Sequence, residues 1–230
     1  MNKSIIILGK GPSLLRCTKE FVDQYDDIAI CGFPPFTEDF LKLINNRKIK
    51  YHFCNCGDPH LTKDNKPLYS NEINKQYKIE NIHNINSGVN KYSTYLNNKN
   101  IFKENLKDTF FDEFKVKYNF DKWGPSCGIY GFHYIISLKK YNKISLVGFD
   151  NFEQGKQRYY FHIKHYNPSL LYLIGRRDIS NDNKTIKKTL HDQEKTIKYL
   201  STIFNNNKST LFELYSNIKF NKSFDNLIIL

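Results

Sequence analysis

The stretch that decides the fold is SIIILGKGPSL at residues 4–14. Its apolar run at 5–8 is followed at once by Gly9, and a short apolar run bounded by glycines is typical of a buried strand in a parallel sheet. Glycines after such a strand let the backbone approach a ligand closely, and a helix that begins near Ser13 presents N–H groups to an anion. The stretch predicts strand, tight turn and helix, with a phosphate or nucleotide site at Gly9, Lys10 and Gly11. It is not the dinucleotide-binding G-x-G-x-x-G pattern, because Leu14 takes the place of the third glycine.

Further apolar runs along the chain alternate between strand and helix patterns. Strands that alternate with helices predict right-handed β-α-β units, and therefore an α/β, Rossmann-like, mostly parallel sheet with helices on both faces, an α/β/α sandwich. The strand at 210–214 is expected to close the sheet. The other expected strands are at 27–31, 50–54, 79–85 and 143–147, and the expected helices are at 37–44, 129–141 and 183–204, with a partly helical segment within 97–119.

The 230 residues exceed the roughly 150 of a typical domain, so one large domain with an insertion is expected. Residues 151–182 are too long for a passive connection and carry many tyrosines, histidines and arginines, which indicates a lid. We therefore expect one domain formed by 1–150 and 183–230, and a lid or acceptor-side insertion at 151–182.

Charge and cysteine content narrow the function classes. The chain holds 35 Lys and Arg against 23 Asp and Glu, a net charge of +12, while 40% of its residues are hydrophobic. Such a chain folds with a basic surface that attracts phosphates of nucleic acid, of a nucleotide or of anionic lipid. Five scattered cysteines argue against a disulfide framework and predict a cytoplasmic protein. Cys54 and Cys56 lack the second ligand pair of a structural zinc site, so we predict no metal.

The apolar runs at 5–8 and 227–230 are shorter than a signal-peptide core or a membrane span, so neither export nor membrane integration is expected. The second run, beside a basic surface, could add a peripheral contact with anionic lipid. The sequence also has no phosphate-loop motif, no H-E-x-x-H and no D-x-D carboxylate pair.

Three other positions have a functional and a structural interpretation. Ser126-Cys127-Gly128 precedes a helix, so it either helps to bind an anion or simply caps the helix. Asp150 ends a strand, where functional carboxylates and Asx-turns are both frequent. His191 is either a general base, because imidazole titrates near neutral pH, or a solvated helix residue.

In this order, the motifs resemble those of the bacterial sialyltransferases of glycosyltransferase family 42. That family opens with a strand and G-N-G-P-S-L, similar to residues 9–14 here, and it has an S/T-S-G turn before a buried helix, similar to 126–128. Its strand ending in G-hydrophobic-D and an aromatic, followed by a glycine turn and a tyrosine, is similar to 148–160. Its general-base histidine, six residues before Ile-Lys, looks like His191 before Ile197-Lys198.

The resemblance implies a nucleotide-sugar-binding domain and a metal-independent, inverting transfer of sialic acid or a related sugar from a CMP-sugar to a glycan hydroxyl, with no cofactor. It implies that His191 takes the acceptor proton. Tyr159 or Tyr160 would hydrogen-bond the departing phosphate. The donor-binding residues that it implies, with the positions discussed above, are Gly9, Lys10, Gly11, Ser13, Gly32, Asn55, Ser126, Cys127, Gly128, Asp150 and Phe152.

Several of these positions depart from the family pattern. Lys10 and Gly32 stand where donor-binding asparagines are expected, and Cys127 replaces a serine. Phe152 lacks the hydroxyl of the first phosphate-binding tyrosine. Lys10 either compensates electrostatically for Phe152 or indicates a donor with more phosphate charge.

The resemblance also implies a glycan or glycolipid acceptor, as in lipooligosaccharide synthesis, a peripheral place at the inner face of an anionic membrane, and a homo-oligomer, a tetramer in related enzymes. Two other functions remain open. One is a pterin pyrophosphokinase-like enzyme that uses ATP and Mg²⁺. The other is a basic nucleotide- or nucleic-acid-binding domain with a degenerate site, although no nucleic-acid-binding motif is visible and nucleic acid is not expected as a partner.

Overall fold

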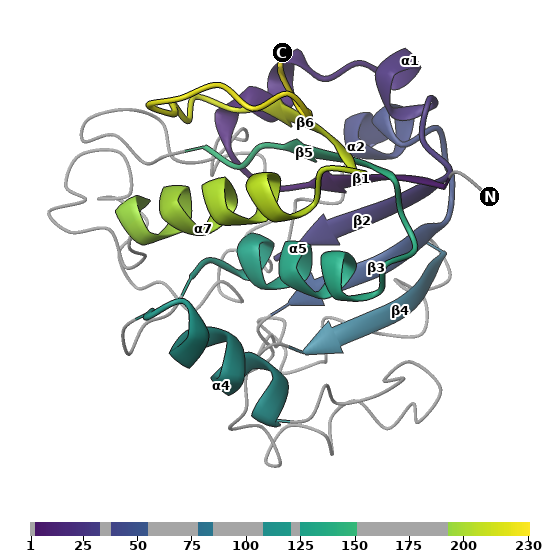
Figure 1. Ribbon diagram of the computed structural model, residues 1–230. Helices are drawn as coiled ribbons and strands as arrows, with labels where there is room; N and C mark the ends of the chain where they lie inside the picture. Colours follow the sequence, from purple (N-terminus) through teal and green to yellow (C-terminus); the bar gives the residue numbers. More distant parts are fainter. Residues whose placement is uncertain (1–2, 33–37, 55–77, 85–107, 121–124, 151–192) are drawn as a thin grey trace, which may run out of the picture.

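A parallel sheet of seven strands forms the centre of the molecule, in the order β4-β3-β2-β1-β5-β6-β7. The computed structural model describes residues 3–32, 38–54, 78–84, 108–120, 125–150 and 193–230 (Figure 1). The strands are β1 (Ser4–Leu8), β2 (Asp27–Cys31), β3 (Ile49–Cys54), β4 (Ile79–Asn84), β5 (Lys143–Val147), β6 (Leu211–Tyr215) and β7 (Leu227–Ile229). The helices are the 3₁₀ helix η1 (Pro12–Arg16) and the α-helices α1 (Lys19–Val22), α2 (Glu38–Leu43), α4 (Asp108–Lys117), α5 (Cys127–Ser137) and α7 (Gln193–Asn206).

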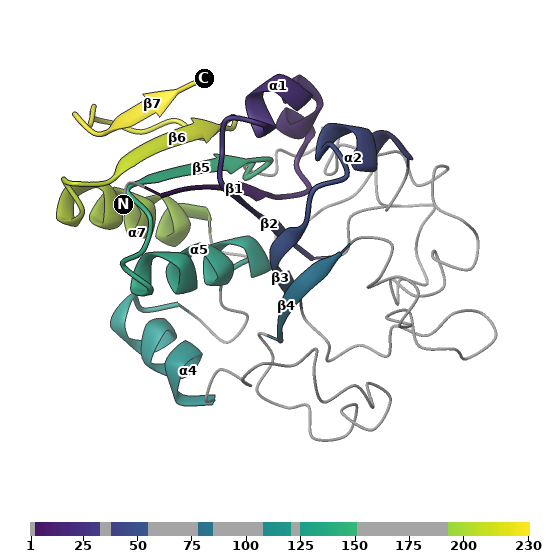
Figure 2. The same ribbon diagram turned by 90° about the vertical axis from the view of Figure 1, so that its right-hand side faces the viewer.

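Helices cover both faces of the sheet, as Figures 1 and 2 show: α5 and α7 lie on one face, and α1 and α2 on the other. The alternation of side chains along β1 explains this arrangement, because Ile5 and Ile7 pack in the core under α5 and α7, while Ile6 and Leu8 pack under η1, α1 and α2. The predicted α/β fold, with a parallel sheet and helices on both faces, is confirmed.

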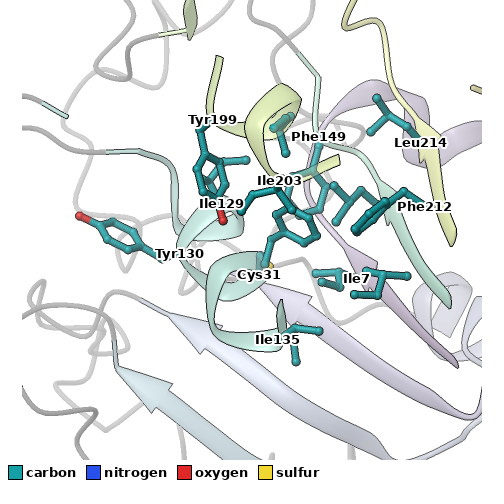
Figure 3. Close-up of a cluster of buried hydrophobic side chains, with 14 of the residues drawn as sticks. Ile7, Cys31, Ile129, Tyr130, Ile135, Phe149, Tyr199, Ile203, Phe212 and Leu214 are labelled. Atoms are coloured by element: carbon teal, nitrogen blue, oxygen red, sulfur yellow. The ribbon is translucent and has the colours of Figure 1, made fainter. Parts of the chain in front are cut away.

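The larger core lies between the sheet, α5 and α7. Figure 3 shows Phe149, Phe212 and Ile203 meeting the buried face of α5. The buried residues of α7 are spaced as one stripe of a helix, Tyr199 and Leu200 followed one turn later by Ile203 and Phe204. Helix α4 packs outside this layer, where the ring of Phe114 lies 5.1 Å from the ring of Tyr199.

Several element boundaries differ from those expected. A regular helix beginning near Ser13 is replaced by η1 and the short α1, because Pro12 and the Thr18 cap divide the segment. Helix α5 begins at Cys127, not at residue 129. The expectation that the strand at 210–214 closes the sheet is wrong. The strand β7 pairs in parallel outside β6, through Phe212 and Leu227.

The run at 227–230 therefore has a structural role as the edge of the sheet, although Ile228 and Ile229 remain 43% and 55% exposed. Within the described parts of the chain, no helix is long and apolar enough to cross a membrane.

Candidate functional site

The candidate site is the carboxyl edge of the sheet, at the point where the strand order changes direction. Strand β1 lies between β2 and β5, so the chain goes from β1 to one side and returns on the other. In sheets of this kind the turns after the two diverging strands leave a crevice that binds ligands. Residues 9–13 follow β1, Gly32 follows β2, and residues 148–150 follow β5.

Two backbone hydrogen bonds hold the turn after β1 against the turn after β5. Gly9 N donates to Val147 O at 2.7 Å, and Gly11 N donates to Gly148 O at 2.8 Å. A β-carbon on Gly9 would lie 2.5 Å from Gly148 O, and one on Gly11 would lie 2.2 Å from Asp150 Oδ2. These two glycines are needed because the turns of the protein itself approach each other so closely.

The side chains of Ser13 and Asp150 add further hydrogen bonds between these turns. Asp150 Oδ2 accepts a hydrogen bond from Ser13 N at 2.8 Å, and its Oδ1 accepts one from Asn217 N at 2.9 Å. Ser13 Oγ donates to Tyr215 O at 2.8 Å and accepts from Gly148 N at 3.0 Å. The carboxylate and the hydroxyl thus join the ends of β1, β5 and β6. Donor binding by these residues stays a prediction beside this structural role.

The turn after β2 is built differently. Gly32 has φ +69°, in the left-handed region, and the end of the Lys10 side chain lies against it. Gly32 N donates to Phe53 O at 2.7 Å, and His52 Nε2 donates to Gly32 O at 2.5 Å. Because a carbonyl oxygen only accepts, the proton of this bond is on Nε2 of the fully buried His52.

Helix α5 begins beside this turn. Ser126 is its N-cap, and Ser126 Oγ accepts a hydrogen bond from Ile129 N at 3.4 Å. Ser126 therefore caps the helix, and its predicted binding of an anion stays a prediction. Cys127 Sγ donates to Phe53 O at 2.9 Å, which ties the first turn of α5 to the end of β3. Gly128 is buried, and a β-carbon on it would lie 2.7 Å from the ring of Phe149.

The thiol of Cys31 lies within the electrostatic reach of both Lys10 and Cys127. Burial holds the pKa of Cys31 well above its usual value, more than the nearby Lys10 charge lowers it. Cys31 is therefore a neutral thiol and is unsuited to be a nucleophile. The Lys10 side chain thus brings a positive charge to the turn after β2, against Gly32 and within electrostatic reach of Cys31.

Five predicted site residues lie outside the described residues: His191, Tyr159, Tyr160, Asn55 and Phe152. The predicted insertion at 151–182 lies outside them as well. Within the described parts of the chain, no group of three His, Cys, Asp or Glu side chains is placed to hold a metal ion, and the metal-independence of the chemistry stays a prediction.

Sequence reasoning missed His52 and Asn217. The His52 ring donates a hydrogen bond to Gly32 O, and Asn217 donates its backbone N–H to Asp150. The position of His52 in an alternating strand, Tyr51-His52-Phe53, was a usable signal, because a polar residue inside a buried strand needs a partner. Asn217 had no such signal, since it contributes only its backbone.

The parallel sheet and its covering helices define a Rossmann-like α/β protein, with its candidate ligand site at the carboxyl edge of the sheet. No protein-family model matches the chain, and no curated protein matches it. Solved structures do match. The chain is similar to the sialyltransferase CstII from Campylobacter jejuni, solved with the substrate analogue CMP-3FNeuAc, at 21% identity and a TM-score of 0.60, over 100% of this chain and 95% of that one.

An alanine variant of the same sialyltransferase, solved with CMP, is similar at 20% identity and a TM-score of 0.60. The match covers 99% of this chain and 95% of the other. Both comparisons agree with the fold that the sequence resemblance implied, over nearly the whole length of the two chains.

Proposed function

We propose that this chain is a sialyltransferase-like glycosyltransferase that moves sialic acid or a related sugar from a CMP-sugar to a glycan hydroxyl. The observation that carries the proposal is the match of the fold, over the whole chain, to a sialyltransferase solved with a CMP-sugar analogue. The positively charged turn at Lys10 and the N-terminal turn of α5 at the carboxyl edge add a reason to expect a phosphate-bearing donor.

In the proposed reaction the acceptor hydroxyl oxygen attacks the anomeric carbon while the bond from that carbon to the CMP phosphate oxygen breaks. The configuration inverts, and the acceptor proton goes to the imidazole of His191, the general base that the sequence resemblance implies. Tyr159 or Tyr160 donates a hydrogen bond to the CMP phosphate as its charge develops. Metal-independent chemistry is part of this proposal.

The acceptor is proposed to be a glycan or glycolipid at an anionic membrane surface. The net charge of +12 supports this choice, because a basic protein concentrates at such a surface. Binding of the purified chain to vesicles with and without anionic lipid, at two salt concentrations, measures this part of the proposal separately from the chemistry.

Two measurements test the enzyme. Calorimetry with CMP, CDP, UDP, GDP and ATP, with and without Mg²⁺, is expected to show preferential binding of CMP without metal. Release of CMP from CMP-sialic acid, in the presence of an acceptor, is expected to fall roughly 100-fold or more in His191→Gln, because the variant lacks the base. Unchanged turnover removes His191 from the mechanism. Binding of ATP alone, with Mg²⁺, overturns the sialyltransferase and favours the pyrophosphokinase-like alternative.

A further inference from the structure

The side chain of Lys10 occupies the space that a side chain at position 32 would take. A β-carbon built on Gly32 would lie 2.9 Å from Lys10 Cε and 3.0 Å from Lys10 Nζ. Real β-carbons rarely approach another atom so closely, so a side chain at position 32 and the Lys10 ammonium compete for one place. Residue 10 and residue 32 come from different turns, after β1 and β2, and are coupled through this contact.

The backbone at position 32 is fixed and cannot move away from Lys10. Gly32 N donates to Phe53 O at 2.7 Å, and Gly32 O accepts from the buried His52 ring at 2.5 Å. The peptide groups on both sides of Gly32 are thus tied to β3. With φ at +69°, the position also disfavours most side chains. The glycine and its two hydrogen bonds therefore form a rigid seat for the end of the Lys10 side chain.

Two thiols of the described residues, those of Cys31 and Cys127, lie near this seat. Cys31, whose thiol interacts electrostatically with Lys10, is buried and neutral. Cys127 directs its thiol to Phe53 O and begins α5, whose N-terminal end has a partial positive charge. Lys10 thus brings a full positive charge to the carboxyl edge of the sheet, near the N-terminal end of α5.

We propose that Lys10, seated on Gly32, recognises the donor through its phosphate, and that Gly32 is the specificity-determining partner that makes room for the ammonium. This inference rests on the proposed CMP-sugar site. It predicts that the protein distinguishes CMP from cytidine mainly through Lys10, since the two ligands differ only in the phosphate.

The test is calorimetric binding of CMP and of cytidine to the wild type, Lys10→Met, Gly32→Asn and the double variant. Methionine keeps much of the length of lysine without its charge, and asparagine tolerates a positive φ better than other residues with side chains. Lys42→Met, on the exposed face of α2, is the matched control for the loss of one charge. Thermal unfolding of each variant verifies that it is folded.

Lys10→Met is expected to weaken CMP binding roughly 10- to 100-fold, the usual effect of losing a charged hydrogen bond, and to leave cytidine binding unchanged. The dependence of CMP affinity on salt should also become less steep. Gly32→Asn should weaken CMP binding by displacing the ammonium, and the double variant should be no weaker than Lys10→Met alone, because both changes remove the same contact.

Three outcomes overturn this inference and leave the proposed function intact: an equal loss of CMP and cytidine affinity in Lys10→Met, no loss beyond that of Lys42→Met, or fully additive losses in the double variant. If the wild type binds neither CMP nor cytidine, the proposed function and this inference fail together. The Lys10→Met arm stands even if Gly32→Asn does not fold.

Discussion

The turns after β1 and β2 both contain glycine, but the glycines have different structural roles. After β1, Gly9 and Gly11 let the turn close against Gly148 and Asp150, and hydrogen bonds fill the space between them. After β2, Gly32 leaves a space that the Lys10 side chain enters. The backbone of the first turn is part of the scaffold, whereas the second turn leaves room for the charged side chain of Lys10, which comes from the first turn. A glycine-rich turn at a strand end is thus not by itself evidence of a ligand site.

The strongest test of this comparison is Gly9→Ala. The new β-carbon would lie 2.5 Å from Gly148 O, and backbone on both sides leaves nothing flexible to move. We expect the free energy of unfolding, measured by urea denaturation, to fall by about 3 kcal/mol. Leu15→Ala, at a side chain that is 67% exposed, is the control and should change it by less than about 0.5 kcal/mol. Equal stability of the two variants would show that the turns can separate without cost.

The next largest effect is expected at Asp150, whose carboxylate joins the turns after β1 and β5. Asp150→Asn keeps the shape of the side chain but turns an NH₂ group toward one of the two backbone N–H donors that Asp150 now accepts from. We expect a loss of about 2 kcal/mol in the free energy of unfolding. Asp39→Asn, on the exposed surface of α2, is the matched control. A loss no larger than in that control would assign Asp150 a role other than scaffolding.

The half of the sheet that carries Lys10 should also respond to pH. His83 on β4 is buried between Phe53 and Tyr134, and burial lowers its pKa to about 4. The unfolded chain takes up the proton near pH 6.5, so between pH 6.5 and 4 the unfolded state binds more protons and stability falls as the pH falls. His83 should contribute a loss of about 2 kcal/mol between pH 7 and pH 5.

The variant His83→Phe keeps an aromatic ring and should flatten this part of the pH profile, while His133, whose pKa burial also lowers to about 4, continues to contribute. Urea denaturation at pH 7, 6 and 5 gives both profiles. Parallel profiles for the two proteins would show that His83 does not bury a neutral ring.

The smallest expected effect is at the start of α5. Ser126→Ala removes the cap to Ile129 N and should lower the free energy of unfolding by about 1 kcal/mol or less, with Ser126→Asp as the variant that keeps a cap. Urea denaturation measures both. A loss as large as in Asp150→Asn would place Ser126 in the scaffold that joins the turns after β1 and β5.

The parallel sheet could be predicted because its strands are short apolar runs separated by turn residues, as residues 4–14 illustrate. The edge strand β7 could not be distinguished from a terminal segment that contacts a membrane surface, since a short apolar run such as Leu227–Ile229 is compatible with both. For the same reason, the parallel pairing of β7 with β6 follows only from the three-dimensional arrangement.

At the candidate site, the sequence predicted the turns that the structure brings together after β1 and β5, but not the atoms through which they contact each other. Ser13 and Asp150 were predicted to bind the donor, which stays a prediction, and the sequence did not indicate that their hydrogen bonds also join three strand ends. The Lys10–Gly32 contact joins residues 22 positions apart and has no local signature in the sequence. Such contacts depend on tertiary packing, which spacing along the chain does not encode.

The central place of β1 has a consequence for the order of synthesis. The sheet extends from β1 through β2, β3 and β4 on one side, and through β5, β6 and β7 on the other. A growing chain can complete the first side early, yet the second edge of β1 has no neighbour until β5 leaves the ribosome, more than half the chain later. Until then an apolar strand edge is open to other chains, so a nascent chain stalled before β5 is the species most prone to aggregate.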